Sequence, residues 1–181
     1  MNWFQSRQQR ELAKKIEASR ERVFRVAFAW CHDADLADDL TQDALSRGLV
    51  NAGQLREDEK LNGWLLAILH RCWIDYLRSR RVHESDEVLA ELPCNQPGPD
   101  GHAEARETVR RVRAAVAALP LGQRQVVTLV DLEELSYAEV AEILVIPIGT
   151  VMSRICRARA ALRVLLEAEP ARKENHLRCV K

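Results

Sequence analysis

The stretch SYAEVAEILVIPIGTVMSRICRARA, residues 136–160, decides the fold of the second half of the chain. Ser136 precedes Glu139 by three residues, the spacing of a capping box, in which each side chain satisfies a free backbone N–H at the start of a helix. The short helix that begins there should bury three apolar residues, Val140, Ile143 and Leu144. A turn at VIPI follows, and Gly149-Thr150 opens a longer helix. Two helices joined by a tight turn form a helix-turn-helix pattern.

The longer helix, which should run to about residue 167, has two different faces. Apolar residues recur at helical spacing on the face expected to be buried: Val151, Ile155, Ala158 and Leu162. Thr150, Ser153 and Arg157 point the opposite way, and that exposed stripe is bordered by Met152, Arg154 and Cys156. Arg159 and Arg163 follow, with no acidic residue between Thr150 and Leu166. This arrangement favours DNA binding, although a solvated arginine face on an ordinary helix is the alternative.

Helical periodicity continues through the rest of the chain and predicts an all-α fold of two small domains. In the C-terminal part we expect a helix at about 104–118, with Val109, Val112, Val116 and Leu119 facing inward, and another at about 123–132. In the N-terminal part we expect helices at about 8–31, 34–50 and 61–81, separated by a polar break at 32–35 and a polar loop at 51–59. The last of these N-terminal helices is apolar almost all round in its first half and ends in arginines.

An acidic segment separates the two helical parts. Residues 82–103 hold five acidic residues and no Lys or Arg, while the whole chain balances 27 basic against 27 acidic residues. No proline occurs before residue 93, and three fall at 93, 97 and 99, where a helix cannot continue. The sequence therefore predicts an N-terminal domain at 1–81, a flexible linker at 82–103 and a C-terminal domain at 104–181.

Composition excludes several classes of protein. No apolar run approaches the roughly 20 residues that span a bilayer, and the N-terminus lacks a secretory hydrophobic region, so we expect a cytoplasmic protein. The five cysteines include no CxxC pair, and Cys31-His32 offers only two of the four ligands that a structural zinc site needs. We therefore expect no metal, no cofactor and no disulfide framework.

Three blocks of sequence resemble the extracytoplasmic-function (ECF) sigma factors of bacterial RNA polymerase, in the order typical of that family. DADLADDLTQDAL, residues 33–45, is similar to the acidic polymerase-binding helix of the family. WLLAILHRCWIDYLRSRR, residues 64–81, is similar to its promoter-melting helix, and residues 119–163 are similar to its promoter-binding helix-turn-helix. The resemblance covers nearly all of residues 20–168 and implies a protein that binds core RNA polymerase and promoter DNA.

The resemblance also implies which residues form each surface. The clamp coiled coil of the largest polymerase subunit is the expected partner of the acidic helix, through Asp38, Asp39, Gln42 and Asp43. Melted minus-ten DNA is the expected ligand of the next helix and of the loop before it, through Lys60, Asn62, Arg71, Asp75, Arg78, Arg80 and Arg81. We expect Trp64 and Ile68 in the core, while Trp73 is open between a core residue and a base-stacking residue.

The minus-thirty-five element is the expected ligand of the last helix, through Thr150, Met152, Ser153, Arg154, Cys156, Arg157 and Arg159. Ser153 and Arg157 are expected on base edges, and Arg154 and Arg159 on phosphates. The chain departs from the family pattern at two positions. Arg71 stands where the family usually has Asn, and Val145 stands where the turn usually has Gly. At Val145 either the turn changes type or a β-branched residue is strained at positive φ.

Other functions remain alternatives at this point. A stand-alone helix-turn-helix regulator would bind DNA without polymerase, but it would need a sensor or dimerisation domain in place of residues 1–81. A pure interaction module would not need the arginines of the last helix. Enzyme activity and a small-molecule substrate are not expected, because no His or cleft-forming loop accompanies the paired carboxylates. The family resemblance further implies an anti-sigma factor, either membrane-bound or not. We also expect the two domains to be held together by more than the linker, whose acids could screen the DNA-binding arginines.

Overall fold

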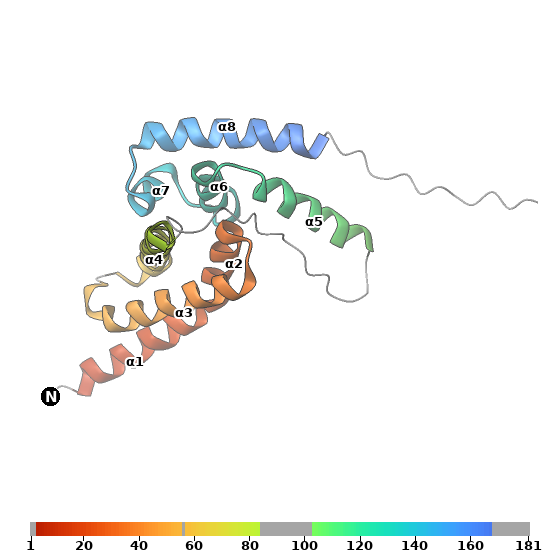
Figure 1. Cartoon of the computed structure of the whole chain (residues 1–181). Helices are drawn as coiled ribbons and strands as arrows, with labels where there is room; N and C mark the ends of the chain where they lie inside the picture. The colour runs from red at the N-terminus through yellow and green to blue at the C-terminus, as the bar shows by residue number, and fades with distance from the viewer. Residues whose placement is uncertain (1–2, 56, 84–102, 168–181) are drawn as a thin grey trace, which may run out of the picture.

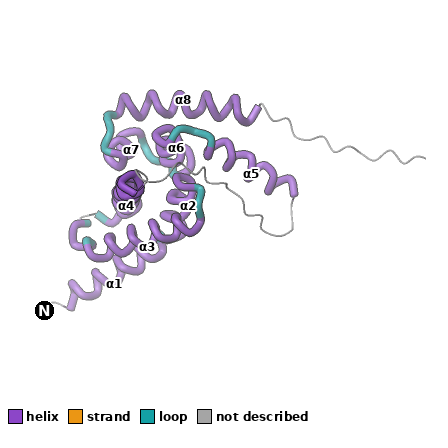
Figure 2. The backbone as a smooth tube through the Cα atoms, in the orientation of Figure 1, coloured by secondary structure: helices purple, strands orange, loops and turns teal. Residues whose placement is uncertain are grey.

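The computed structural model describes residues 3–55, 57–83 and 103–167, and within them the chain is helical without a strand (Figures 1 and 2). The N-terminal part contains α1 (Trp3–Ala18), α2 (Arg20–Cys31), α3 (Ala34–Val50) and α4 (Leu61–His83), with 3-10 turns at Ala52–Gln54 and Asp58–Lys60. The C-terminal part contains α5 (Ala103–Ala117), α6 (Leu121–Val127), a π-helical turn (Thr128–Leu132), α7 (Tyr137–Leu144) and α8 (Ile148–Glu167). No helix in these described ranges is long and apolar enough to cross a membrane. The all-α fold predicted from the sequence is confirmed.

The single helix predicted over residues 8–31 is wrong, because the chain breaks at Ser19 between α1 and α2. The Ser19 amide donates to the carbonyls of both Lys15 and Ile16, at 3.2 and 3.1 Å, and its hydroxyl also donates to the Lys15 carbonyl. A serine side chain that bonds back to the preceding turn competes with the regular helical ladder. The polar break predicted at 32–35 is confirmed: His32 adopts a left-handed conformation after α2, and the Asp33 carboxylate accepts from the Leu36 amide to cap α3.

The core of the N-terminal part lies between α2, α3 and α4. Trp30, Leu65 and Leu69 are fully buried there, as the apolar first half of α4 predicts. Helices α3 and α4 approach closely at Gly48, where a Cβ atom would lie 2.9 Å from the Leu65 Cδ2 atom. A larger residue at position 48 would therefore force the Leu65 side chain to shift.

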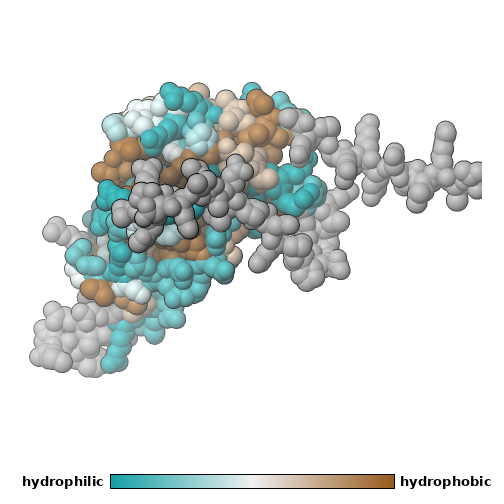
Figure 3. Space-filling model, in the orientation of Figure 1, coloured by the Kyte–Doolittle hydropathy of each residue, from teal (hydrophilic) through white to brown (hydrophobic). Residues whose placement is uncertain are grey.

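Helix α5 is less buried than its apolar periodicity predicts. Leu119 is buried beyond its end, but Val109 and Val112 keep 48% and 40% of their surface exposed, so their predicted inward orientation is wrong. Within the described residues α5 packs on α8 and α2, and Arg111 donates to the Leu166 carbonyl at 2.9 Å. Figure 3 shows hydrophobic surface near the C-terminal end of α8, where Val164 and Leu165 are also exposed.

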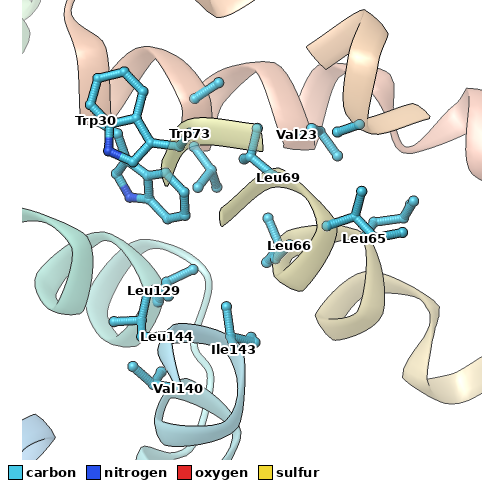
Figure 4. Close-up of a cluster of buried hydrophobic side chains, with 14 of the residues drawn as sticks. Val23, Trp30, Leu65, Leu66, Leu69, Trp73, Leu129, Val140, Ile143 and Leu144 are labelled. Atoms are coloured by element: carbon cyan, nitrogen blue, oxygen red, sulfur yellow. The ribbon is translucent and has the colours of Figure 1, made fainter. Parts of the chain in front are cut away.

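The two helical parts pack directly on each other. Helices α6 and α7 and the π-helical turn contact α2 and α4, and one hydrophobic cluster runs through both parts. Figure 4 shows the side chains that meet there: Trp30, Leu66, Leu69 and Trp73 from the N-terminal part, and Leu129, Val140, Ile143 and Leu144 from the C-terminal part. The described helices therefore form one body with a shared core.

Candidate DNA- and polymerase-binding surfaces

The capping box at the start of α7 forms as the sequence predicts. The Ser136 amide donates to Glu139 Oε2 at 2.8 Å, and the Glu139 amide donates to Ser136 Oγ at 3.3 Å. Hydrogen bonds from Ser136 lower the pKa of the Glu139 carboxyl, which keeps it ionised in this role. The predicted burial of Val140, Ile143 and Leu144 is confirmed as well.

Val145 ends α7 in the left-handed region, with φ 53° and ψ 50°. The backbone closes the turn around it, because the Ile146 amide donates to the Ala141 carbonyl at 3.1 Å. Of the two outcomes considered for this position, the turn keeps its geometry and a β-branched residue occupies a strained conformation.

Helix α8 has the two faces predicted for it. Val151, Ile155 and Ala158 are buried, and Leu162 is partly buried. On the other side Met152, Cys156 and Arg157 are exposed, whereas Thr150 and Ser153 are half-buried. The Ser153 hydroxyl donates to the Thr150 carbonyl at 3.0 Å, so its lone pairs remain available to a ligand. A shallow groove runs beside this stripe and is lined by Tyr137, Met152, Ile155, Cys156, Arg159, Ala160 and Arg163.

Two of the α8 arginines are held by neighbouring helices, which the sequence does not reveal. Arg159 forms an ion pair with Asp131 of the π-helical turn, with Nη2–Oδ1 at 2.6 Å and Nε–Oδ2 at 3.3 Å. This pairing raises the pKa of the guanidinium. Arg154 is half-buried and lies against the first turn of α6, where a Cβ on Gly122 would be 3.0 Å from the Arg154 Cζ atom. Arg157, in contrast, is exposed on α8.

The acidic side chains of α3 lie on one face but are partly engaged within the chain. Arg20 of α2 pairs with Asp38 at 2.6 Å, and Gln42 Nε2 donates to the other Asp38 oxygen at 2.8 Å. Asp39 is exposed beside them. The pairing with Arg20 joins residues 18 positions apart, and no local sequence signal predicts it.

Arg47 links the predicted polymerase surface to the predicted minus-ten surface. Its guanidinium pairs with Asp43 of α3 at 2.9 Å and with Asp75 of α4 at 3.1 Å, and Asp75 followed by Asp43 raises its pKa. The sequence places Arg47 on the polar side of this helix, but Arg47 was not among the residues predicted for either surface. The four-residue spacing of Asp43 and Arg47 predicts the ion pair between them, but no sequence signal predicts the pair with Asp75.

The minus-ten residues predicted on α4 and in the loop before it fall into two groups. From the middle of α4 to its C-terminal end, Arg71 and Arg78 are exposed with Asp75, and Arg80 is half-buried, while the side chain of Arg81 lies outside the described residues. At the N-terminal end Asn62 is half-buried, and Lys60 forms an ion pair with Glu57 at 2.9 Å that raises its pKa. A Cβ on Gly63 would lie 4.0 Å from the Ile143 Cδ1 atom of α7, so this end of α4 faces the C-terminal part.

The tryptophans of α4 belong to the core. Trp73 is 6% exposed and stacks on Tyr76, with ring centroids 5.7 Å apart, which settles the choice left open for it in favour of a core position. Ile68 is buried and Trp64 is partly buried against the same cluster, as predicted. Burial also raises the pKa of the neighbouring Cys72 thiol to about 12, so the thiol stays protonated. Among the residues that the structure describes, no three His, Cys, Asp or Glu side chains are grouped as a metal site.

Comparisons of the chain with family models and with known proteins point to the same family. A family model described as Sigma-70 region 2 matches residues 16–82, and one described as Sigma-70, region 4 matches residues 109–162. The chain is 38% identical over 141 residues to the ECF RNA polymerase sigma factor EcfG of Rhodopseudomonas palustris, covering 77% of this chain and 76% of the relative. It is 34% identical over 161 residues to the ECF RNA polymerase sigma factor SigC of Mycobacterium tuberculosis, covering 89% of this chain and 85% of the relative.

Solved structures agree with the sequence relatives. The sigma factor RpoE of Bartonella quintana, in a co-crystal with the anti-sigma factor NepR, superimposes with a TM-score of 0.73 at 26% identity, over 87% of this chain and 97% of that one. The two family regions, the sequence relatives and this fold all correspond to the same class of protein. The chain therefore belongs to the ECF sigma factors of the sigma-70 family, the subunits that bind RNA polymerase and direct it to promoters.

Proposed function

We propose that residues 1–81 bind core polymerase and melted minus-ten DNA, that residues 104–181 read the minus-thirty-five element, and that 82–103 connect them. The observation that supports this division best is the exposure of α8. The helix buries one face and exposes the other, which carries Arg157, and it follows the capped helix α7. A helix presented in this way fits the major groove, where base edges carry a unique donor and acceptor pattern.

On α8 we assign Arg157 and Ser153 to base edges, with Thr150, Met152 and Cys156 at the edge of that contact. Arg157 is exposed and Ser153 has free lone pairs. Arg154 and Arg159 contact phosphates in this proposal. Their support on α6 and on Asp131 fits that role, because a phosphate contact sets the register of the protein on the duplex.

On α3 we assign Asp38, Asp39, Gln42 and Asp43 to core polymerase. The exposed Asp39 offers its carboxylate directly, whereas Asp38 and Asp43 would exchange Arg20 and Arg47 for basic groups of the partner. Such an exchange contributes specificity and orientation more than affinity.

On α4 and the loop before it we assign seven residues to melted minus-ten DNA: Lys60, Asn62, Arg71, Asp75, Arg78, Arg80 and Arg81. The exposed guanidinium groups of Arg71 and Arg78 supply the positive charge that a single strand requires. Because Trp73 is in the core, base stacking must come from another side chain or from the arginine planes.

The partners follow from this assignment. An anti-sigma factor is the third partner, after core polymerase and promoter DNA, since the solved relative RpoE is bound to one. Sigma factors are transcription initiation factors rather than enzymes, and we propose no enzyme activity and no small-molecule substrate for this chain. The cytoplasm, where polymerase meets the chromosome, is the compartment in which this function operates.

Run-off transcription tests the proposal. Core polymerase should produce a specific transcript from a matching promoter only when this chain is added. A stand-alone regulator would instead bind upstream DNA without producing any transcript, and that result would reject the proposed function.

A further inference from the structure

The outer surface of α8 carries an apolar row beside the polar residues assigned to base edges. Ile148, Met152 and Cys156 recur every four residues, so they lie one above the other along the helix. All three are exposed, and Ile148 and Met152 keep 47% and 51% of their surface accessible. The neighbouring row, one residue further along the chain, holds Ser153 and Arg157. Helix α8 therefore presents two parallel rows of side chains, one apolar and one polar.

The apolar row lies in a positively charged surface. It borders the shallow groove beside α8, which Arg159 and Arg163 also line. Asp131 pairs with Arg159 from the π-helical turn, but α8 itself has no acidic residue before Glu167. A ligand of this surface must therefore carry negative charge and present apolar groups at the same time.

Two kinds of ligand meet both requirements: an acidic amphipathic helix of another protein, and the major groove of DNA. An amphipathic helix inserts several large side chains and needs a broad apolar surface. The apolar row is only one side chain wide, because Ser153 and Arg157 lie on one side of it and Arg159 on the other. In the major groove each A·T pair offers one small apolar group, the C5-methyl group of thymine, next to the hydrogen-bonding atoms of the bases. A narrow apolar row beside a polar row matches DNA.

We propose that the apolar row of α8 recognises the C5-methyl group of thymine in the minus-thirty-five element, with Met152 as the side chain in contact. The inference rests on the proposed function, in which Ser153 and Arg157 lie on base edges of the same groove. The Met152 thioether is unbranched and polarisable, so it can adapt its shape to a methyl group. Burial of one methyl group should tighten binding about fourfold, from roughly 0.8 kcal/mol per buried carbon. The upstream element of this chain therefore includes a thymine that hydrogen bonds alone do not select.

Deoxyuridine isolates this contact, because it pairs with adenine as thymine does and lacks only the C5-methyl group. A duplex selected by the full chain from a pool of random sequences provides the probe, and each of its thymines is replaced in turn by deoxyuridine. At one thymine or more, the replacement should weaken binding to the parent about fourfold, measured by fluorescence anisotropy at fixed salt. Unchanged affinity at every deoxyuridine, or a selected duplex without an A·T pair, would overturn the proposal.

Three variants assign the methyl contact to its side chain. Met152→Ala should abolish the preference for thymine over deoxyuridine, whereas Met152→Leu keeps an apolar side chain and should retain it. Val164→Ala is the matched control and should retain it as well, since Val164 is an exposed apolar residue near the other end of α8. Circular dichroism verifies that the three variants remain folded. If the row binds a protein instead of DNA, Met152→Ala leaves every thymine preference as it is in the parent, and the proposal is wrong.

Failure of this inference is distinguishable from failure of the proposed function. If the chain is not a promoter-specificity subunit, run-off transcription yields no specific product and the random pool yields no preferred sequence. If only the methyl contact is wrong, both assays succeed, and duplexes with thymine and with deoxyuridine bind equally well.

Discussion

At the scale of single residues, Val145 shows how a helix-turn-helix tolerates a poor turn residue. Its φ of 53° lies in the region that costs an L-residue roughly 1–2 kcal/mol. The side chain is 81% exposed, so it recovers little of this cost through packing. The surrounding turn imposes the conformation, because the buried Ile143 and Leu144 on one side and the buried Val151 of α8 on the other determine where the chain must pass.

Val145→Gly should therefore raise the free energy of unfolding by about 1 kcal/mol, the strain released less the entropy that glycine adds to the unfolded chain. Urea unfolding followed by circular dichroism measures this difference. Val145→Ala is the control and should gain much less, because alanine keeps the Cβ that clashes in the left-handed region. A destabilised Val145→Gly would show that the valine side chain contributes contacts that outweigh the strain.

Arg157 and Arg159 should behave differently although they lie two residues apart on α8. Arg157→Ala should lose about 1–3 kcal/mol of discrimination between a matched and a scrambled minus-thirty-five duplex, as expected for a side chain on a base edge. Arg159→Ala should weaken binding to both duplexes alike. Fluorescence anisotropy with the full chain at one fixed salt concentration measures both, with Arg25→Ala as a distant control. If Arg157→Ala lost the same affinity for both duplexes, Arg157 would contact phosphate and not a base edge.

At the scale of elements, short-range sequence signals predicted where the helices lie far better than which surfaces of them are covered by other helices. The bounds of α3 and the cap of α7 follow from short-range rules, and the structure agrees with both. The periodicity of α5 was misleading at Val109 and Val112, because an apolar stripe indicates which face could be buried, not whether an element lies over it. At the break, the Ser19 hydroxyl donates to the Lys15 carbonyl, and apolar periodicity does not register a side-chain hydrogen bond of this kind.

Removing the acidic charges of α3 should weaken the binding of core polymerase without destabilising the fold. Replacing Asp38 and Asp39 together with Ala should weaken the affinity for core polymerase clearly. The free energy of unfolding should change by less than about 1 kcal/mol, since the Arg20–Asp38 pair is exposed to solvent. Titration against core polymerase and urea unfolding measure the two quantities, and Glu17→Ala, an exposed acid on α1, is the control. Unchanged polymerase affinity would remove α3 from the polymerase-binding surface.

At the scale of the whole molecule, the sequence predicted two helical parts but not how they meet. The acidic segment and its prolines mark where the helices stop, and no periodicity connects Arg22 with Glu133 or His70 with Gln125. These contacts depend on side chains 111 and 55 positions apart, which come together only when both parts are folded. The expectation that more than the connecting segment holds the two parts is confirmed by the shared core. The idea that its acids screen the arginines concerns residues outside those described and stays a prediction.

A shared core also predicts how the chain unfolds. When two parts bury side chains against each other, neither can unfold without exposing part of the other, so the parent should unfold in one cooperative transition. The four tryptophans all lie in the N-terminal part, at positions 3, 30, 64 and 73, whereas helical circular dichroism reports on both parts. Tryptophan fluorescence and circular dichroism should therefore give coincident urea transitions for the parent and for Arg25→Glu, a charge reversal at a residue whose ion pair with Glu21 lies within α2. In Arg22→Glu, which places a second carboxylate against the buried Glu133 of the C-terminal part, the two signals should separate, because the packing between the two parts is weakened. Separate transitions already in the parent would mean that the common core contributes little free energy and that the two parts are held together only by the chain between them.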